Sequence, residues 1–234
     1  MGILDFLFPK YCVNCRKLGS YLCPNCFAYI SFDDSGTCLV CRRPAIDGIT
    51  HPACKSRHAI DGAFASIAYK GVVRKLIYNF KYKPYLTDLQ HVLVDLFYEG
   101  LIQKEAFDRA YRDSSIEKIM LAPIPLHSSR LKSRGYNQAE ILAKGLSEKL
   151  NLRMFPVLER IKKTDSQIHL KQKERKENIA GAFAVRKNAQ EILKGAGIFL
   201  IDDVLTTGST LLEASRMLKR AGAKKVWGLA LARD

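Results

Sequence analysis

The alternation of hydrophobic and polar residues predicts strands and helices that follow one another from about residue 61 to the end of the chain. Residues 63–69 (AFASIAY) alternate as a half-buried strand does, whereas residues 71–83 and 86–102 carry apolar side chains at helical spacing. The same patterns predict buried strands at 118–125, 197–201 and 225–232 and helices at 138–150 and 209–221. Strand–helix–strand units of this length favour an α/β fold in which helices cover both faces of a parallel sheet.

The first 58 residues lack this pattern and contain all of the cysteines, so we expect a separate small domain at 1–58 and an α/β domain at 59–234. The seven cysteines and one histidine form four pairs, each with two residues between its members: Cys12 and Cys15, Cys23 and Cys26, Cys38 and Cys41, and His51 and Cys54. Such pairs let a tight turn aim two ligands at one metal, and eight ligands are enough for two tetrahedral zinc ions. Disulfides would need an oxidising compartment and would leave one cysteine unpaired.

The spacing leaves the pairing of the ligands open. The simplest arrangement is sequential, with the first four cysteines on one zinc and the last four ligands on the other, but a crossed arrangement joins the first and third pairs. His58 is an alternative to His51 as the eighth ligand. In every arrangement four protein ligands leave no position for water, so both zinc ions are expected to be structural.

The charge of the chain points to partners that carry phosphate. It has 234 residues, 47% of them hydrophobic, and a formal net charge of +15. Nucleic acids and nucleotides are the partners that such an excess of Lys and Arg favours, although a basic protein with nothing bound has the same balance. No apolar stretch is long enough to span a membrane, and the short apolar start lacks the features of a signal peptide. We therefore expect a cytoplasmic protein, with residues 1–8 packed on the domain behind them.

Two carboxylates and an anion-binding loop follow the predicted strand at 197–201. Asp202 and Asp203 come first, and the small residues Thr206, Thr207, Gly208, Ser209 and Thr210 then lead into a predicted helix. A helix N-terminus with free N–H groups and hydroxyls favours a phosphate. Paired carboxylates suit the vicinal hydroxyls of a ribose, or a Mg²⁺ ion. No Gly-Lys-Ser/Thr follows, so the loop is not of the ATP-hydrolysing Walker type.

The segment FLIDDVLTTGSTL (199–211) resembles the phosphoribosyl pyrophosphate (PRPP) motif of type I phosphoribosyltransferases. The resemblance implies that Asp202 and Asp203 hold the ribose 2′- and 3′-hydroxyls and are the catalytic residues of any transferase activity. It also implies that the 5′-phosphate binds to residues 206–210, with Mg²⁺ accompanying PRPP.

Cationic residues elsewhere could contact the diphosphate of PRPP or the phosphates of a nucleic acid. Arg130, Lys132 and Arg134 lie between a predicted strand and the helix that Asn137 and Glu140 would begin as a capping box, with Gly135 allowing a tight turn. The polar segment 160–181 occupies the position of a hood over the site, or is a solvated basic loop.

Two further segments narrow the resemblance to the ComF family of competence proteins. PIPLHSSRLKSRGYNQAEILA (123–143) resembles the family's segment before its central helix. A second segment carries the family's Gln-x-x-Leu, Arg-x-x-Asn and Phe pattern at Gln167, Leu170, Arg175, Asn178 and Phe183. An N-terminal double zinc ribbon is the family's other mark, although its last pair is usually Cys-x-x-Cys where this chain has His51 and Cys54.

Three functions fit these features. The ComF resemblance implies a cytoplasmic DNA-uptake factor for natural transformation, which handles single-stranded DNA beside a DEAD-box-like helicase or translocase. Aromatic residues interleaved with lysines suit single-strand binding, although they are equally suited to a core: Lys75, Tyr78, Phe80, Lys81, Tyr82, Lys83 and Tyr85. The alternatives are an active phosphoribosyltransferase with an unidentified acceptor and a PRPP-sensing regulator without chemistry. No residue pattern identifies a nucleobase pocket or a general base for a nucleophile.

Overall fold

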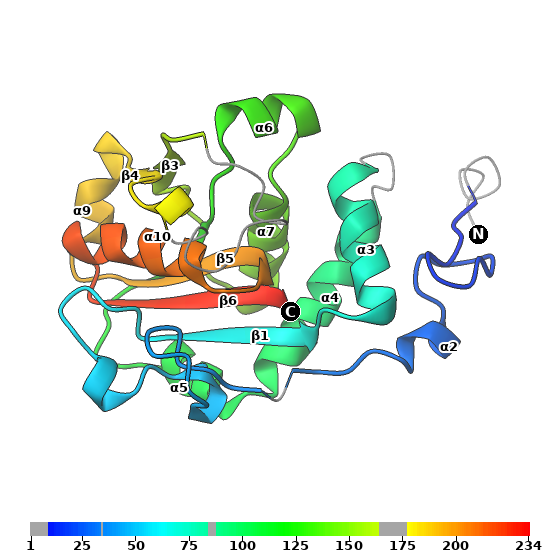
Figure 1. Cartoon of the computed structure of the whole chain (residues 1–234), viewed down its shortest axis with the longest axis horizontal. Coiled ribbons are helices and arrows are strands. Elements are labelled where there is room, and N and C mark those ends of the chain that lie inside the picture. Colours follow the sequence, from blue (N-terminus) through cyan, green and yellow to red (C-terminus); the bar gives the residue numbers. More distant parts are fainter. Residues whose placement is uncertain (1–8, 34, 84–87, 164–176) are drawn as a thin grey trace.

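A parallel sheet forms the centre of the molecule (Figure 1). The computed structural model describes residues 9–33, 35–83, 88–163 and 177–234. In this part of the chain the main sheet has four strands in the order β1 (Gly62–Ala68), β6 (Lys225–Arg233), β5 (Gly197–Leu205) and β2 (Ile119–Pro123). All three pairings are parallel, so the carboxyl ends of the strands share one edge, where ligands of open α/β sheets bind.

Each face of the sheet has its own hydrophobic core, because successive side chains of a strand point to opposite faces. In β5, Phe199 and Ile201 belong to one core and Ile198 and Leu200 to the other. The first core contains side chains of α3 (Gly71–Tyr82), α4 (Leu89–Ile102), α5 (Glu105–Tyr111) and α7 (Gln138–Leu150). The second contains side chains of α9 (Gln190–Leu193), α10 (Ser209–Arg220) and the antiparallel pair β3 (Leu158–Arg160) and β4 (Phe183–Val185), beside the turn η3 (Lys187–Ala189). The expected α/β fold with helices on both faces is confirmed.

The N-terminal segment protects the outer edge of β1. Phe32 forms an antiparallel bridge with Ile67, and Ile49 forms another with Gly62. Between these bridges, Asp33 accepts a hydrogen bond from Arg233 Nε at 2.7 Å, and both side chains are largely buried. The short helices of this region are α2 (Pro24–Phe27), η1 (Ile46–Gly48) and η2 (Pro52–Cys54). These contacts cover both ends of the edge strand and so limit its pairing with another chain.

The sequence-based helices and strands are confirmed with two corrections. The strand predicted at 197–201 continues to Leu205, because β5 pairs with β6 through Leu205 and Arg233, so Asp202 and Asp203 lie inside the strand rather than after it. The basic segment before Asn137 is a helix, α6 (Ser128–Arg134), that ends at Gly135 in the left-handed conformation. With one leucine in seven residues, α6 carries no apolar periodicity from which it could have been predicted.

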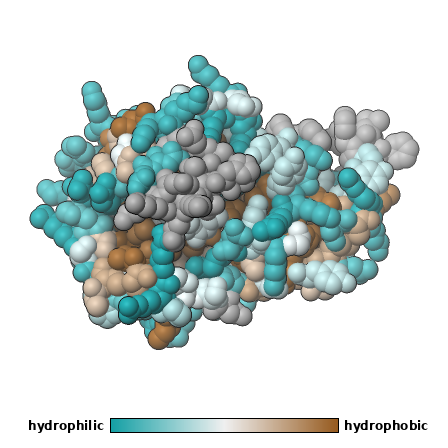
Figure 2. Space-filling view, in the orientation of Figure 1, coloured by the Kyte–Doolittle hydropathy of each residue, from teal (hydrophilic) through white to brown (hydrophobic). Residues whose placement is uncertain are grey.

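Several predictions fall on residues outside the described part of the chain. These are the packing of residues 1–8, the role of Tyr85, most of the 160–181 hood, and Gln167, Leu170 and Arg175 of the ComF-like segment. Hydrophilic residues cover much of the face seen in Figure 2. Among the described residues, the helices are all too short or too polar to cross a bilayer.

Candidate functional site

One cavity of about 880 Å³ opens at the carboxyl end of β5. Its walls include every residue of the predicted sugar-phosphate motif: Asp202, Asp203, Thr206, Thr207, Gly208, Ser209 and Thr210. Helices α3, α6 and the start of α7 form the other walls, with Lys81, Arg130, Arg134 and Gln138. The structure therefore brings the acids, the small-residue loop and two of the three predicted cations into one cavity, while Lys132 is exposed on α6 and is not among the residues that line it.

The two acids have different environments. Asp203 forms an ion pair with Lys81 of α3, with 2.8 Å between Oδ1 and Nζ, and both side chains are mostly shielded from solvent. Although burial lowers the pKa of Lys81, the charge and hydrogen bond of Asp203 raise it overall. Asp202 accepts a hydrogen bond from the backbone N–H of Asp203 at 2.9 Å. Burial, and then the charge of Asp203, raise the pKa of Asp202 to about 7.

The loop after β5 has the geometry of an anion-binding turn. Gly208 is in the left-handed conformation with φ of 71° and is the N-cap of α10, so the first N–H groups of that helix face the loop. The hydroxyls of Thr207 and Ser209 lie 3.0 Å apart and are hydrogen-bonded to each other. A phosphate at this position would meet backbone N–H groups and two hydroxyls together.

The wall formed by α6 and α7 offers hydrogen-bond donors to a second anion. Arg134 Nη1 donates to Gln138 Oε1 at 2.6 Å, which orients the guanidinium and the amide together. Gln138 is 1% exposed and lines the cavity, and its Nε2 has no hydrogen-bond partner among the described residues. A buried amide donor without a partner is costly unless a ligand or water accepts from it. Asn137 is the N-cap of α7, and its side chain accepts a hydrogen bond from Ala139 N–H. The reciprocal bond from the Glu140 side chain that defines a capping box is not among the described contacts.

Three residues of the cavity were not assigned to their present roles from the sequence, although Arg160 begins the segment predicted as a hood. Lys81 was grouped with the aromatic residues of α3, and nothing in its surroundings indicated a partner on β5. Gln138 is an ordinary first residue of a helix in the sequence. Burial, followed by the charge of Arg130, lowers the pKa of Arg160 to about 10, and Arg160 reaches the cavity from β3. These contacts join segments that are distant in the sequence, so no local pattern predicts them.

A second, smaller cavity of about 500 Å³ lies beside the first, between α3 and the segment that holds the first cysteines. It shares Tyr69, Arg74 and Tyr78 with the larger cavity. The rest of its lining is mainly polar and basic: Val13, Asn14, Arg16, Lys75, Asn79 and Lys83. We refer to these two adjoining cavities as the sugar-phosphate cavity and the basic groove.

The aromatic residues of α3 divide between the core and the surface. Phe80 is 5% exposed and belongs to the core, as the alternative interpretation of these residues required. Tyr78 and Tyr82 are 59% and 53% exposed, and their ring centroids are 4.9 Å apart. The guanidinium of Arg134 lies 5.3 Å from the centroid of the Tyr82 ring, so α3 and α6 are in contact where both line the cavity.

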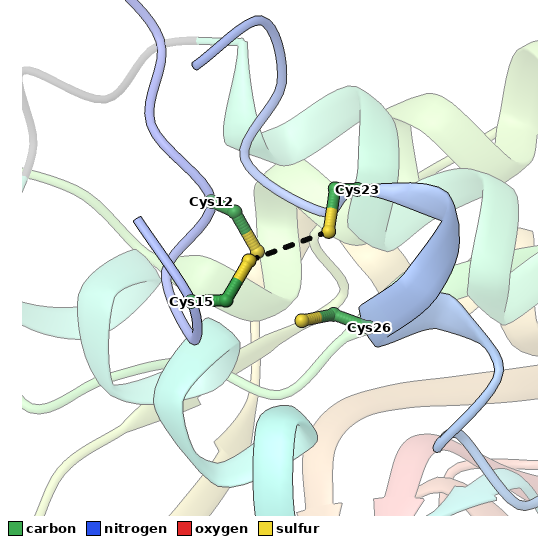
Figure 3. Close-up of side chains that lie close together, drawn as sticks. All are labelled: Cys12, Cys15, Cys23 and Cys26. Carbon is green, nitrogen blue, oxygen red and sulfur yellow. Dashed lines mark hydrogen bonds between the residues drawn. The ribbon is translucent and has the colours of Figure 1, made fainter. Parts of the chain in front are cut away.

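The first four cysteines converge on one point (Figure 3). The sulfur atoms of Cys12, Cys15, Cys23 and Cys26 lie within 4.8 Å of one another, as the sequential arrangement predicts. Burial raises the pKa of Cys12, but hydrogen bonds from neighbouring backbone N–H groups outweigh burial and lower it to about 6. Four thiolates at this spacing fit a tetrahedral zinc ion, and they close its coordination shell.

The second cluster contains His51 rather than His58. The ligand atoms of Cys38, Cys41, His51 and Cys54 also lie within 4.8 Å of one another. His51 Nδ1 is 3.2 Å from Cys41 Sγ, and its Nε2 is 3.0 Å from the backbone oxygen of Pro44. A zinc-bound imidazole commonly donates its other N–H to a carbonyl, which fixes the ring and its tautomer. The donor set and its support therefore fit zinc.

Comparison with protein-family models identifies the two parts of the chain. Residues 3–55 match the double zinc ribbon domain, and residues 132–233 match the phosphoribosyl transferase domain. The Cys and His clusters lie within the first match and the sugar-phosphate motif within the second. The boundary between residues 58 and 59 falls between the two matches and stays a prediction.

Curated relatives carry names that refer to competence and DNA use. Competence protein F of Haemophilus influenzae is 42% identical over 117 residues, which are 48% of this chain and 50% of that protein. DNA utilization protein YhgH of Escherichia coli K12 is 34% identical over 112 residues, 47% of this chain and 48% of that protein. This chain thus spans about half the length of these relatives. Competence protein ComFC of Bacillus subtilis is 26% identical over 219 residues, 91% of this chain and 79% of that protein.

Proposed function

We propose that this chain, which has a phosphoribosyl transferase domain and a double zinc ribbon and is homologous to Competence protein F, ComFC and YhgH, is a DNA-uptake factor. It binds PRPP with Mg²⁺ in the sugar-phosphate cavity and single-stranded DNA in the basic groove. The observation that carries the proposal is the meeting of the two cavities at Tyr69, Arg74 and Tyr78. The chain acts in the cytoplasm, where reducing conditions keep its cysteines available to zinc.

The proposed pose of PRPP follows from the polarity of the cavity walls. Asp202 and Asp203 accept hydrogen bonds from the ribose 2′- and 3′-hydroxyls, because a carboxylate is an acceptor and a hydroxyl donates well to it. The 5′-phosphate lies at residues 206–210, where Gly208 and the N-terminus of α10 direct N–H groups toward it. The acids and the phosphate are therefore kept apart, since the acids contact the ribose hydroxyls and the phosphate is at the other end of the sugar.

The diphosphate at C1 then extends toward α6 and α7. Arg130 and Arg134 supply the cationic contacts, and Gln138 Nε2 donates the hydrogen bond for which no described residue accepts. Mg²⁺ bound with PRPP would neutralise part of the diphosphate charge, using oxygen ligands. Lys132 is left free for more distant phosphates, because it is exposed and outside the lining of the cavity.

The basic groove suits the backbone and bases of a single strand. Arg16, Arg74, Lys75 and Lys83 attract phosphates, and the exposed ring of Tyr78 offers a stacking surface. The strand would pass between the first zinc cluster and α3, so both domains would contact it. A DNA helicase or translocase is the partner we propose for delivering that strand.

One observation favours an enzyme as the second candidate function. Asp202, with its pKa near 7, lies in the cavity where C1 of PRPP would be held, so it can exchange a proton at neutral pH. In a phosphoribosyltransferase, Asp202 would accept a proton from an acceptor nucleophile as diphosphate departs from C1. A PRPP-sensing regulator would show the same binding without turnover.

Binding and transformation measurements test the proposal. Calorimetric titration with PRPP and Mg²⁺ should show binding to the wild type and none to the double variant Asp202→Asn/Asp203→Asn. Binding of labelled single-stranded DNA, measured by fluorescence anisotropy, should be the same in both. Transformation should then be measured in a naturally competent host whose own gene is deleted and replaced by either form, at matched protein level. Normal transformation by the double variant would show that DNA uptake does not need PRPP binding. Release of diphosphate from PRPP in the presence of an added acceptor would favour the transferase.

A further inference from the structure

We propose that the second zinc cluster is a structural part of the sugar-phosphate cavity, and that Leu39 is the positioning residue that connects them. Leu39 lies between the ligands Cys38 and Cys41, and its side chain packs on Gly208 of the loop proposed to hold the 5′-phosphate. The loop would then keep its binding conformation only while the second metal is present. The affinity part of this inference rests on the proposed function; the structural part does not.

The contact between Leu39 and Gly208 is close and specific. A Cβ atom added at Gly208 would lie 2.8 Å from Cδ2 and 2.9 Å from Cδ1 of Leu39, closer than carbon atoms approach. Leu39 is 4% exposed and belongs to the same core as Leu205 and Leu211, which flank the loop on both sides. The leucine thus fills the space behind the glycine and supports the turn from the side opposite the cavity.

The position of Leu39 is set by the turn that carries the ligands. Cys38 N–H donates to the oxygen of Arg43, and Arg42 N–H donates to the oxygen of Cys38, with Arg42 at a φ of 63°. A bound zinc would fix Cys38 and Cys41 on either side of Leu39, because the four ligand atoms already surround one point. Without metal, short segments of this type have too little core to hold their conformation.

The first zinc cluster has no such connection to the loop among the described contacts. Val13 occupies the position equivalent to Leu39, after Cys12, but it packs on the opposite core and lines the basic groove. The two clusters therefore serve different sites: the first borders the basic groove and the second supports the sugar-phosphate loop. Loss of one metal should have an effect that loss of the other does not reproduce.

The test compares Leu39→Ala with two matched valine variants in the full chain. Val40→Ala changes a neighbouring side chain that is 42% exposed, and Val13→Ala changes the equivalent position of the first cluster. Hydrogen exchange measured by mass spectrometry should show faster exchange at residues 206–210 in Leu39→Ala, by about tenfold, because a buried leucine is deleted beneath the loop. Zinc content should stay at two ions per chain in all three variants.

Affinity and metal removal complete the test. PRPP affinity should fall by roughly tenfold in Leu39→Ala, because part of the binding free energy is then used to reorder the loop. It should stay unchanged in Val40→Ala. Cys54→Ser, which removes a ligand of the second metal, should also speed exchange at 206–210, whereas Cys15→Ser at the first cluster should not. Equal exchange at 206–210 in Leu39→Ala and Val40→Ala would overturn the inference. If the wild type does not bind PRPP, the proposed function fails, while the exchange data still decide the role of Leu39.

Discussion

Lys81 Nζ lies 2.8 Å from Asp203 Oδ1, so an ion pair joins the end of α3 to the proposed ribose site on β5. The side chains of Lys81 and Asp203 are only 22% and 14% exposed, which leaves little solvent to replace either partner. Breaking such a pair from one side leaves a charge that is poorly solvated. The contact therefore both anchors α3 and orients one acid of the motif.

Replacing Lys81 by methionine keeps an unbranched side chain, one atom shorter, and removes its charge. We expect Lys81→Met to lower the free energy of unfolding by roughly 1 to 3 kcal/mol, because Asp203 loses its partner in a partly buried position. Urea denaturation followed by circular dichroism measures the loss. Lys70→Met, at an exposed position just before α3, is the control and should change stability by less than about 0.5 kcal/mol. Equal losses in the two variants would contradict the prediction.

The raised pKa of Asp202 makes stability depend on pH. Burial and the charge of Asp203 raise this pKa from 3.8 to about 7, so the folded state holds a proton that the unfolded state releases between these values. Stability therefore falls as pH rises from about 4 to about 7. Asp202→Asn removes this dependence and should be more stable than the wild type at pH 8 by on the order of 1 to 2 kcal/mol. One pKa unit is worth 1.36 kcal/mol, and the full shift is discounted because Asp202 is only half-buried.

Denaturation curves at pH 5 and pH 8 measure this effect. The advantage of Asp202→Asn should be present at pH 8 and should shrink at pH 5, where the wild-type carboxyl is protonated. Asp108→Asn, which removes a carboxylate that is 52% exposed on α5, is the matched control. A difference between wild type and Asp202→Asn that is the same at both pH values would mean that ionisation of Asp202 is not its cause.

The parts of the molecule that follow local patterns were predictable from the sequence. An apolar run predicts β5, helical spacing of apolar residues predicts α10, and the small residues between them indicate the loop. The short spacing identifies the four ligand pairs. It leaves their pairing open, and the folded structure selects the sequential arrangement. The corrections concern α6, which has no apolar periodicity, and the polar end of β5, which pairing with β6 extends.

The relationships between distant segments were not predictable. The pairing of Lys81 with Asp203 depends on how α3 packs on the sheet, and the contact of Leu39 with Gly208 depends on how the second zinc cluster lies along β1. Gly208 had an evident reason to be glycine in the turn, since its φ is positive. Its second reason, the space that Leu39 occupies, exists only in the folded molecule.

The histidine that completes the second cluster can be identified by metal content. His51→Ala should lower the zinc content from two ions to one per chain, because Nδ1 of His51 is among the converging ligand atoms. His58→Ala should keep both ions. Metal analysis of the purified, desalted proteins gives the stoichiometry directly. Loss of zinc in His58→Ala but not in His51→Ala would reverse the assignment.

Stacking on Tyr78 gives the sharpest test of the basic groove. The ring is 59% exposed, so its removal should not unfold the protein, yet it lies where the groove and the sugar-phosphate cavity meet. We expect Tyr78→Ala to weaken single-stranded DNA binding by about 1 to 3 kcal/mol, the worth of one stacked base, and Tyr78→Phe to bind as the wild type does.

The basic side chains of the groove should instead determine how strongly DNA binding depends on salt concentration. Lys75→Gln should lower the slope of log affinity against log salt by about 0.7, the contribution of one phosphate contact on a single strand. Fluorescence anisotropy titrations at several salt concentrations measure both effects. If Tyr78→Ala and Lys75→Gln bind with unchanged affinity and slope, the strand does not follow this groove. Loss of binding in Tyr78→Phe equal to that in Tyr78→Ala would point to the hydroxyl rather than to stacking.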